Sequence, residues 1–509
     1  MTQPLHGLRL VVSGFELEQQ EHRGIAVFTK GLLRALKAAG AEIWLLTEFQ
    51  PSTQDLAIAR VPKAVETRVT TSRVLEKLNS GDDTEDEQSS IIKLLNQLPL
   101  SRKILGLSKI LKKEGRNLKS SLFPRRLINN RKLKIIPKAE FLNSPYKRCE
   151  RLSYIEYIDG LICARNCYLD SFSLAKSKRS QPLLIDLRGF DGLITTSPLN
   201  IKPLNTDLFA QTIHDLIPLD YQRTKDHLPS FTQRLNTANQ ASKIFVSNDA
   251  KSNYEHSFVG EKRILGPSQC VVTQSPSLEF PGDSLDWEAR TQQIKILSNN
   301  QKQYSLAPCS YFLFNSSVVP HKNLLFALNA FMESGLEHKN IALCITGKLQ
   351  KDDYSKLVGH VAANHESVIF TGYVDEATKR KLYLNALALL SPSLVEGFGI
   401  PVLDAACLGL STIASPLGSH REIQAMNDFS DHVLLCSTLI SSDWASAMRL
   451  ITVKHEQVFA ALSPQDQIKK INQLRAERIK RYRHYKKLID QTFQRTVCDL
   501  LISGGATDE

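Results

Sequence analysis

The sequence predicts an α/β protein built from two doubly wound domains that face each other across a cleft. Residues 8–46 have the pattern strand, helix, strand, and residues 387–415 have the pattern strand, glycine loop, helix, strand. The length of 509 residues, 42% of them hydrophobic, leaves room for two to three domains with sizeable cores. Open α/β sheets bind ligands at the carboxyl ends of their strands, so we expect the functional residues to face the cleft.

The first domain opens with an apolar strand at residues 8–13, a helix over 29–39 and a second strand at 42–46. Apolar side chains recur on one face of that helix, which is typical of a helix packed on a sheet. Gly24 lies in the loop before the helix, where a residue without a side chain lets the backbone come close to a ligand. A glycine that only begins the helix, with no ligand, explains the pattern equally well.

A long insertion at about residues 50–152 interrupts this pattern, which is unusual in a compact domain. Within it, residues 101–150 contain 15 Lys and Arg against 3 acids, an excess equal to the net charge of +12 of the whole chain. Residues 91–100 and 104–111 have the pattern of amphipathic helices. Either this is a solvated insertion, or its surface meets anionic lipid or a phosphorylated acceptor. No aromatic stacking pattern accompanies the charge, so nucleic acid is not expected as a partner.

The first domain continues with apolar segments that end in polar residues. Strands are predicted at residues 159–163, 183–187, 209–213 and 241–246. The third of these runs into His214 and Asp215 and then a proline turn. Histidine suits a cleft because its protonation changes near neutral pH, and Asp215 could orient it. A structural histidine beside a capping aspartate is the alternative.

A polar stretch, residues 286–308, separates the two domains in this prediction and is expected to be a linker. The second domain, residues 309–470, begins with a strand at 310–314 and a helix over 323–333 that follows Lys322. Further elements are predicted as strands at 341–347 and 368–374 and a helix at 375–385.

The most informative segment of the chain connects the strand at residues 387–390 to the next helix. It reads Glu396-Gly397-Phe398-Gly399-Ile400-Pro401-Val402-Leu403-Asp404. The two glycines let backbone N–H groups approach an anion, and the helix N-terminus beginning near Pro401 adds partial positive charge. Glu396 and Asp404 flank that point, so both carboxylates can face one ligand on opposite sides of its phosphates.

Together with Ser391-Pro392-Ser393, this segment resembles the signature of the retaining family-4 (group 1) glycosyltransferases, which have the GT-B fold of two Rossmann-like domains. The resemblance covers nearly all of residues 312–423 and is sparser over 8–46 and 211–252. It implies a site for a nucleoside-diphosphate sugar as donor substrate, with no cofactor and no metal. It also implies that Glu396 contacts the donor sugar and that Asp404, where the family has Glu, holds the ribose hydroxyls.

The same resemblance assigns further residues to the cleft. His214 would contact a donor-sugar hydroxyl or the acceptor, and Lys322 would neutralise the departing diphosphate. The remaining donor-site residues would be Gly397, Phe398, Gly399 and Ile400 in the phosphate loop, Gly372 and Tyr373 in the loop at the nucleotide base, and Gly24 opposite them.

Three positions depart from the family pattern: Asp404 replaces Glu, His321 replaces Arg, and Ser316 lies where a glycine-bearing segment is expected. The first hypothesis is therefore a hexosyltransferase that moves a sugar to a glycan or lipid-linked acceptor with retention of configuration. The alternative is a catalytically weakened relative that binds a sugar nucleotide or glycan without turnover.

The organisation implied is an acceptor-binding domain at residues 1–285, the linker, the donor domain, and a helix over 471–509 that crosses back to the first domain. Neither an apolar stretch of eighteen residues nor a signal-like N-terminus is present, so we expect a cytoplasmic protein, with peripheral contact to an anionic membrane as one possibility. The nine cysteines are expected to be thiols.

Overall fold

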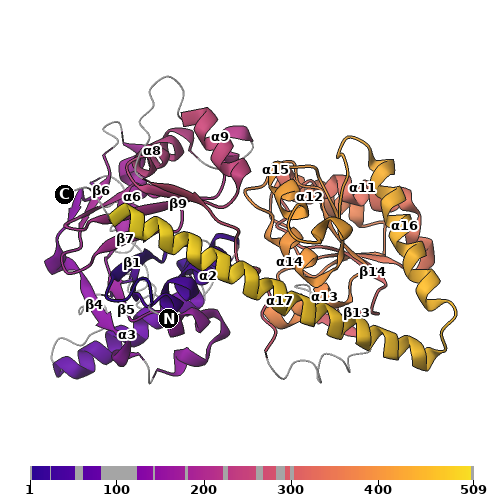
Figure 1. Ribbon diagram of the computed structural model, residues 1–509, viewed down its shortest axis with the longest axis horizontal. Coiled ribbons are helices and arrows are strands. Elements are labelled where there is room, and N and C mark those ends of the chain that lie inside the picture. Colours follow the sequence, from indigo (N-terminus) through magenta and orange to yellow (C-terminus); the bar gives the residue numbers. More distant parts are fainter. Residues whose placement is uncertain are drawn as a thin grey trace, which may run out of the picture.

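The computed structural model describes residues 3–22, 24–51, 61–81, 123–141, 144–177, 181–221, 227–258, 268–281, 293–297 and 303–505. These residues form two α/β units that lie side by side, with one long helix running along both (Figure 1). Each unit is built on a twisted, mainly parallel sheet covered by helices on both faces. The predicted fold class, two doubly wound α/β domains, is confirmed.

The first unit contains an eight-stranded sheet in the order β11-β10-β9-β7-β1-β2-β5-β4. Neighbouring strands are parallel, except that β4 runs antiparallel to β5. Burial on both faces explains why the central strands are continuous apolar runs. The strands are β1 (Arg9–Ser13), β2 (Glu42–Thr47), β4 (Lys134–Pro137), β5 (Gly160–Cys163), β7 (Gly192–Thr195), β9 (Leu208–Ile213), β10 (Ser242–Phe245) and β11 (Gln269–Val271).

A small parallel sheet lies beside the first one, in the order β3-β6-β8. Its strands are β3 (Leu127–Ile128), β6 (Leu183–Asp186) and β8 (Ile201–Leu204). The strand expected at residues 183–187 therefore exists but belongs to this small sheet. The helices of the first unit are α1 (Phe15–Glu18), α2 (Gly24–Ala38), α3 (Lys63–Ser80), η1 (Asn130–Lys132), η2 (Lys138–Glu140), η3 (Pro145–Arg148), η4 (Glu150–Tyr157), α6 (Cys167–Lys176), α7 (Ile217–Asp220), α8 (Leu228–Ala238) and α9 (Asn248–Phe258).

The second unit contains a six-stranded, wholly parallel sheet in the order β16-β15-β14-β17-β18-β19. Its strands are β14 (Tyr311–Phe314), β15 (Ala342–Ile345), β16 (Val368–Phe370), β17 (Ala388–Ser391), β18 (Ser411–Ala414) and β19 (Val433–Leu435). Its helices are η5 (Pro320–Lys322), α11 (Leu324–Ser334), η6 (Leu336–Lys339), α12 (Asp353–Ala362), α13 (Glu376–Asn385), α14 (Ile400–Leu408), α15 (Gly418–Gln424), η7 (Phe429–Asp431) and α16 (Ser441–Phe459).

The segment expected to be a linker, residues 286–308, contains folded structure. Strands β12 (Ile294–Leu297) and β13 (Gln303–Leu306) pair in antiparallel fashion. Ile294, Ile296 and Leu306 are buried in the same apolar cluster as residues of α13. Their apolar side chains are few and lie among polar residues, which is why this segment resembles a linker in sequence.

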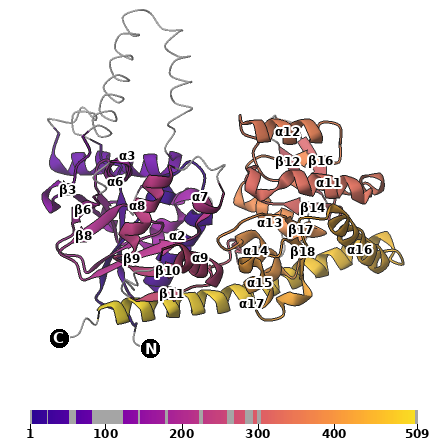
Figure 2. The same cartoon turned by 90° about the horizontal axis from the view of Figure 1, so that it is seen from above.

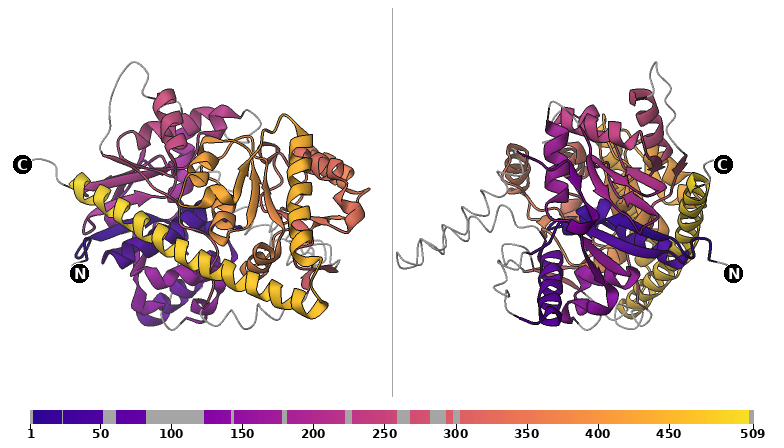
Figure 3. Two further views of the ribbon diagram at one scale, coloured as in Figure 1. Left: turned by 45° about the vertical axis from the view of Figure 1, so that its right-hand side comes forward. Right: turned by 90° about the vertical axis from the view of Figure 1, so that its left-hand side faces the viewer.

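Helix α17 (Pro464–Gly505) crosses from the second unit to the first, as Figures 2 and 3 show from two further directions. It packs on α14 and α13 in the second unit and on α2 and strands β9 to β11 in the first. Apolar residues along it, including Tyr482, Phe493 and Val497, are buried in one continuous core. The helix therefore fastens the two units together.

Residues 82–122 of the insertion, with the helices expected at residues 91–100 and 104–111, lie outside the described residues. Among the helices that are described, none is both long and apolar enough to cross a membrane.

Candidate active site

A cavity of about 890 Å³ lies between the two α/β units, at the carboxyl ends of strands from both sheets. Its lining combines the loop after β1, the end of β9, the crossover from the first unit and four loops of the second unit. Several residues predicted from sequence line this cavity: Gly24, His214, Lys322, Tyr373, Glu396, Gly397, Phe398, Gly399, Ile400 and Asp404.

The glycine loop at residues 396–399 approaches the first unit as closely as backbones allow. A Cβ atom on Gly397 would lie 2.2 Å from the carbonyl oxygen of His214, so only glycine fits there. Gly399 has φ 100°, a conformation that L side chains rarely adopt, and a Cβ there would meet the His420 ring at 2.8 Å. The loop lines the cavity and ends at the N-terminus of α14, where an anion is favoured.

Glu396, at the start of this loop, forms an ion pair with Lys322 at 2.6 Å between Nζ and Oε1. The hydroxyl of Ser393 also donates to Oε1, at 2.8 Å. The Glu396 and Lys322 side chains are only 13% and 16% exposed. Burial alone would raise the pKa of Glu396, but Lys322, His420 and the two hydrogen bonds outweigh it and hold that pKa below its usual value.

Lys322 reaches the cavity from η5, whose last residue it is, immediately before α11. Its neighbour His321 lies close to Tyr221 of the first unit, with ring centroids 5.9 Å apart. Burial, with the nearby charge of Lys322, lowers the pKa of His321 to about 4, so this side chain is neutral near pH 7. The position where the family pattern has Arg therefore brings no second fixed cation to the cavity.

His214 follows the end of β9 and is 6% exposed. Its Nε2 atom lies 2.8 Å from the carbonyl oxygen of Thr196, and its ring packs edge-on against Phe28, with centroids 4.9 Å apart. Burial lowers the pKa of His214 to about 4, so the ring is neutral and donates to that carbonyl. The backbone carbonyl of Thr196 orients the ring, whereas Asp215 accepts a hydrogen bond from the backbone N–H of Ile217 at 3.0 Å.

Gly24 begins α2 and faces the second unit across the cavity. The closest atom to a Cβ placed there is Cδ1 of Ile400, at 3.8 Å. Gly372 follows β16 with φ 72°, and Tyr373 beyond it is 52% exposed at the cavity. Gly24 and Tyr373 thus line the cavity from two sides, whereas Gly372 is not among the lining residues; the groups that these positions would contact remain a prediction.

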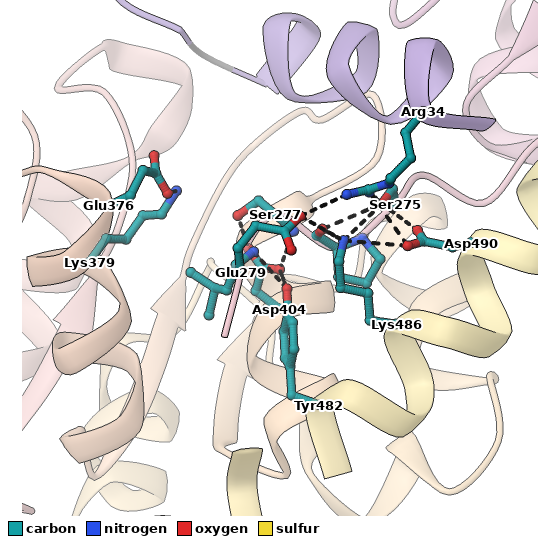
Figure 4. A network of polar contacts seen from close by, with 12 residues as sticks. Arg34, Ser275, Ser277, Glu279, Glu376, Lys379, Asp404, Tyr482, Lys486 and Asp490 are labelled. Carbon is teal, nitrogen blue, oxygen red and sulfur yellow. Dashed lines mark hydrogen bonds and ion pairs between the residues drawn. The ribbon is translucent and has the colours of Figure 1, made fainter. Parts of the chain in front are cut away.

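Asp404 differs most from expectation. It is 1% exposed, and its carboxylate is already occupied by three hydrogen-bond donors of the chain (Figure 4). The backbone N–H of Ser277 and the hydroxyl of Tyr482 each donate to Oδ1 at 2.7 Å, and the hydroxyl of Ser277 donates to Oδ2. Burial raises the pKa of Asp404 despite these bonds. In this structure no face of the carboxylate is open to a ribose.

The segment that replaces the family's glycine-bearing loop, Asn315 to Ser317, also lines the cavity. Gly347, in the loop after β15, lies against this segment: a Cβ there would lie 2.4 Å from the carbonyl oxygen of Ser316. Asn315 is held by Tyr383, to which it donates at 2.7 Å, and by Thr346, from which it accepts at 2.7 Å. The backbones of these two loops therefore lie close together beside the cavity.

Several cavity residues were not predicted from the sequence. The loop between α1 and α2 contributes Gln19, Gln20, Glu21 and His22, and the second unit contributes Lys348, Glu376 and Lys379. Arg151 holds the first of these loops by donating to the carbonyl oxygens of Gln19 and Gln20. For the residues of the first unit, the only signal in the sequence was a polar loop that follows the first strand.

Comparison with known proteins gives the following matches. Residues 299–452 match the family described as "Glycosyl transferases group 1". A serotype-specific mannosyltransferase, WbdA of Escherichia coli, is 25% identical over 231 residues, which are 43% of this chain and 27% of that protein. An O-antigen chain mannosyltransferase B of Escherichia coli is 27% identical over 263 residues, 48% of this chain and 66% of that protein.

Among solved structures, a sucrose-phosphate synthase from Thermosynechococcus elongatus aligns with a TM-score of 0.48 and 13% identity, covering 97% of this chain and 100% of that one. The match to the first curated relatives spans about a quarter of their length.

Proposed function

We propose that the protein transfers a hexose from a nucleoside-diphosphate sugar to a glycan or lipid-linked acceptor, with retention of configuration, because residues 299–452 match the group 1 glycosyl transferases. The observation that carries this proposal is the Lys322–Glu396 ion pair, which lies beside the glycine loop and the N-terminus of α14 inside the cavity between the units. A cation, the N-terminus of a helix and a carboxylate meet there at one place.

Each of these groups has a part in the proposed reaction. The N-terminus of α14 and the ammonium of Lys322 stabilise the negative charge that grows on the diphosphate as the bond to the sugar breaks. Glu396, kept ionised by Lys322, accepts hydrogen bonds from sugar hydroxyls. His214, neutral and fixed by Thr196, lines the cavity, and its other ring nitrogen would accept a hydrogen bond from a ligand there.

The names of the relatives suggest which donor to examine first. Both curated relatives described above are mannosyltransferases, and one is named for the O-antigen chain. We therefore propose a nucleoside-diphosphate mannose as donor and a polysaccharide or its lipid-linked precursor as acceptor. The loop of Gln19 to His22 faces the same cavity from the first unit and would receive the acceptor. We place this reaction in the cytoplasm, with the basic insertion as the contact to an anionic membrane.

A panel of nucleotide sugars tests the proposal. Ligands of the folded protein raise its melting temperature, so a thermal-shift screen finds the donor, and sugar release or transfer is then measured by chromatography. Glu396→Gln keeps the shape of the side chain and serves as the matched control. We expect it to bind the donor but to turn over at least a hundredfold more slowly. Absence of a shift with every nucleotide sugar would overturn the proposal.

The alternative, binding without turnover, is favoured by one observation: His321, which stands where the family pattern has Arg, is neutral near pH 7, so a cation that would stabilise the departing diphosphate is missing. In that case the wild-type protein would bind a nucleotide sugar in the same screen, and neither hydrolysis nor transfer would follow with any acceptor tested.

A further inference from the structure

The contact between Ser277 and Asp404 joins two parts of the chain that belong to different units. Ser277 lies on the segment by which the chain leaves the first sheet after β11, residues 275–281, here called the crossover segment. Asp404 lies on α14 of the second unit, and both residues line the cavity. Ser277 offers two donors, its N–H and its hydroxyl, to the two oxygens of one carboxylate.

The rest of the crossover segment is fixed from the other side (Figure 4). The hydroxyl of Ser275 donates to Asp490 of α17 at 2.5 Å and accepts from Arg34 of α2 at 2.9 Å. Lys486 donates to Pro276 at 2.8 Å. Ser275 thus binds to α2 and α17, whereas Ser277, two residues further on, faces Asp404 and the cavity.

The two donors that Ser277 directs at the Asp404 carboxylate resemble the two hydroxyl donors of a vicinal diol. A pair of neighbouring hydroxyls on a ribose supplies two donors a few ångströms apart, the same arrangement that Ser277 supplies. With Tyr482 also donating to Oδ1 and the side chain 1% exposed, the carboxylate has no room for a second such pair. A ligand diol can reach Asp404 only if Ser277 leaves it.

We infer that Ser277 is an internal competitor for ligand hydroxyls at Asp404, and that it sets how strongly the site prefers nucleotides that carry both ribose hydroxyls. This inference rests on the proposed nucleotide-sugar site. A ribonucleotide exchanges its diol for Ser277 and so gives up part of its binding free energy to break that contact. A nucleotide without the diol leaves Ser277 in place and binds through its diphosphate and base alone.

The experiment titrates the full chain calorimetrically with guanosine and uridine diphosphates and with their 2′,3′-dideoxy counterparts. In Ser277→Ala the hydroxyl competitor is gone, so we expect the better ribonucleotide to bind roughly three- to tenfold more tightly, the range set by one net hydrogen bond. The dideoxy nucleotide should bind as it does to the wild type. Ser277→Thr, which keeps a hydroxyl, should behave as the wild type with both ligands.

Ser275→Ala is the matched control, because it removes a serine hydroxyl from the same segment without touching Asp404. Three results would overturn the inference and leave the proposed function standing. They are equal effects of the two alanine variants, weaker binding of the ribonucleotide by Ser277→Ala, and tighter binding of both nucleotide types by Ser277→Ala. If neither nucleotide binds the folded wild-type protein, the proposed function fails and this inference fails with it. Melting curves of each variant show whether the protein remains folded.

Discussion

Lys322→Ala and Glu396→Gln remove opposite halves of one ion pair, and we expect them to move the affinity for a free nucleoside diphosphate in opposite directions. Lys322 carries three N–H donors, of which one is given to Glu396 at 2.6 Å. The other two remain for phosphate oxygens. The diphosphate can therefore gain a contact to Lys322 while the ion pair stays intact.

The expected loss of affinity follows from the number of Lys322 donors that the diphosphate can use. A charge-assisted hydrogen bond contributes about 1.5–3 kcal/mol, which corresponds to a dissociation constant roughly 10 to 150 times higher in Lys322→Ala. In Lys322→Ala the buried carboxylate of Glu396 also loses its cation and lies unpaired beside the bound diphosphate. The loss of affinity should therefore lie in the upper part of this range. In Glu396→Gln one negative charge near the diphosphate disappears, so the affinity of this variant should exceed that of the wild type.

Isothermal titration of both variants with the same nucleoside diphosphate is the measurement. Lys339→Ala is the control, because Lys339 forms a similar ion pair with Glu456 at 3.0 Å on the surface of the same unit, away from the cavity. It should bind as the wild type does. A Lys322→Ala affinity within threefold of the wild type, or an equal loss in Glu396→Gln, would show that the pair is structural and refute the reasoning.

Three further predictions concern other parts of the chain. Gly397→Ala should lower the melting temperature and weaken donor binding, because its Cβ would lie 2.2 Å from a backbone oxygen. Gly24→Ala should be tolerated, because its Cβ meets nothing closer than 3.8 Å. Thermal melts and titration with the donor compare the two variants. Stability should fall as the pH drops from about 6.5 toward about 4, because the unfolded state protonates His214 and the folded state does not. Urea unfolding of His214→Gln across this range should show that the free energy of unfolding changes less steeply with pH, by the equivalent of up to one proton. An unchanged dependence on pH would contradict the lowered pKa of His214. Finally, flotation with anionic and neutral vesicles should show salt-sensitive binding to anionic vesicles alone, lost when residues 101–122, the part of the basic insertion that precedes β3 and β4, are replaced by a short linker; equal behaviour of both proteins would exclude membrane docking by this segment.

The elements that local pattern determines were predictable from the sequence. The strand at residues 387–390, the helix beginning beside Pro401 and the αL glycine that ends it, Gly409 with φ 69°, all appear where the pattern predicts them. Helix α2 begins at Gly24, five residues earlier than the predicted start at residue 29. The apolar residues just after Gly24 belong to its buried face, so the helix extends over them.

Long-range contacts were not predictable, since nothing local encodes them. The partners of Asp404 lie 127 and 78 residues away, and Arg151 holds a loop 132 residues before it. Motif reasoning therefore identified the carboxylate but not the groups that occupy it. The strand pair β12–β13 was missed for a related reason: its short polar strands gain their stability from packing on the second unit, which the segment itself does not reveal.

Helix α17 has a consequence for the order in which the protein is made. The core of the first unit is completed by Phe493, which packs against Phe28 of α2 with ring centroids 5.7 Å apart. Phe493 follows the last strand of that unit, β11, by about 220 residues. At roughly 5–20 residues per second, the ribosome needs on the order of 10 to 45 seconds to add them. During that time the first unit holds an uncovered apolar face along α2, so chaperone occupancy of this face is expected until the second unit has emerged.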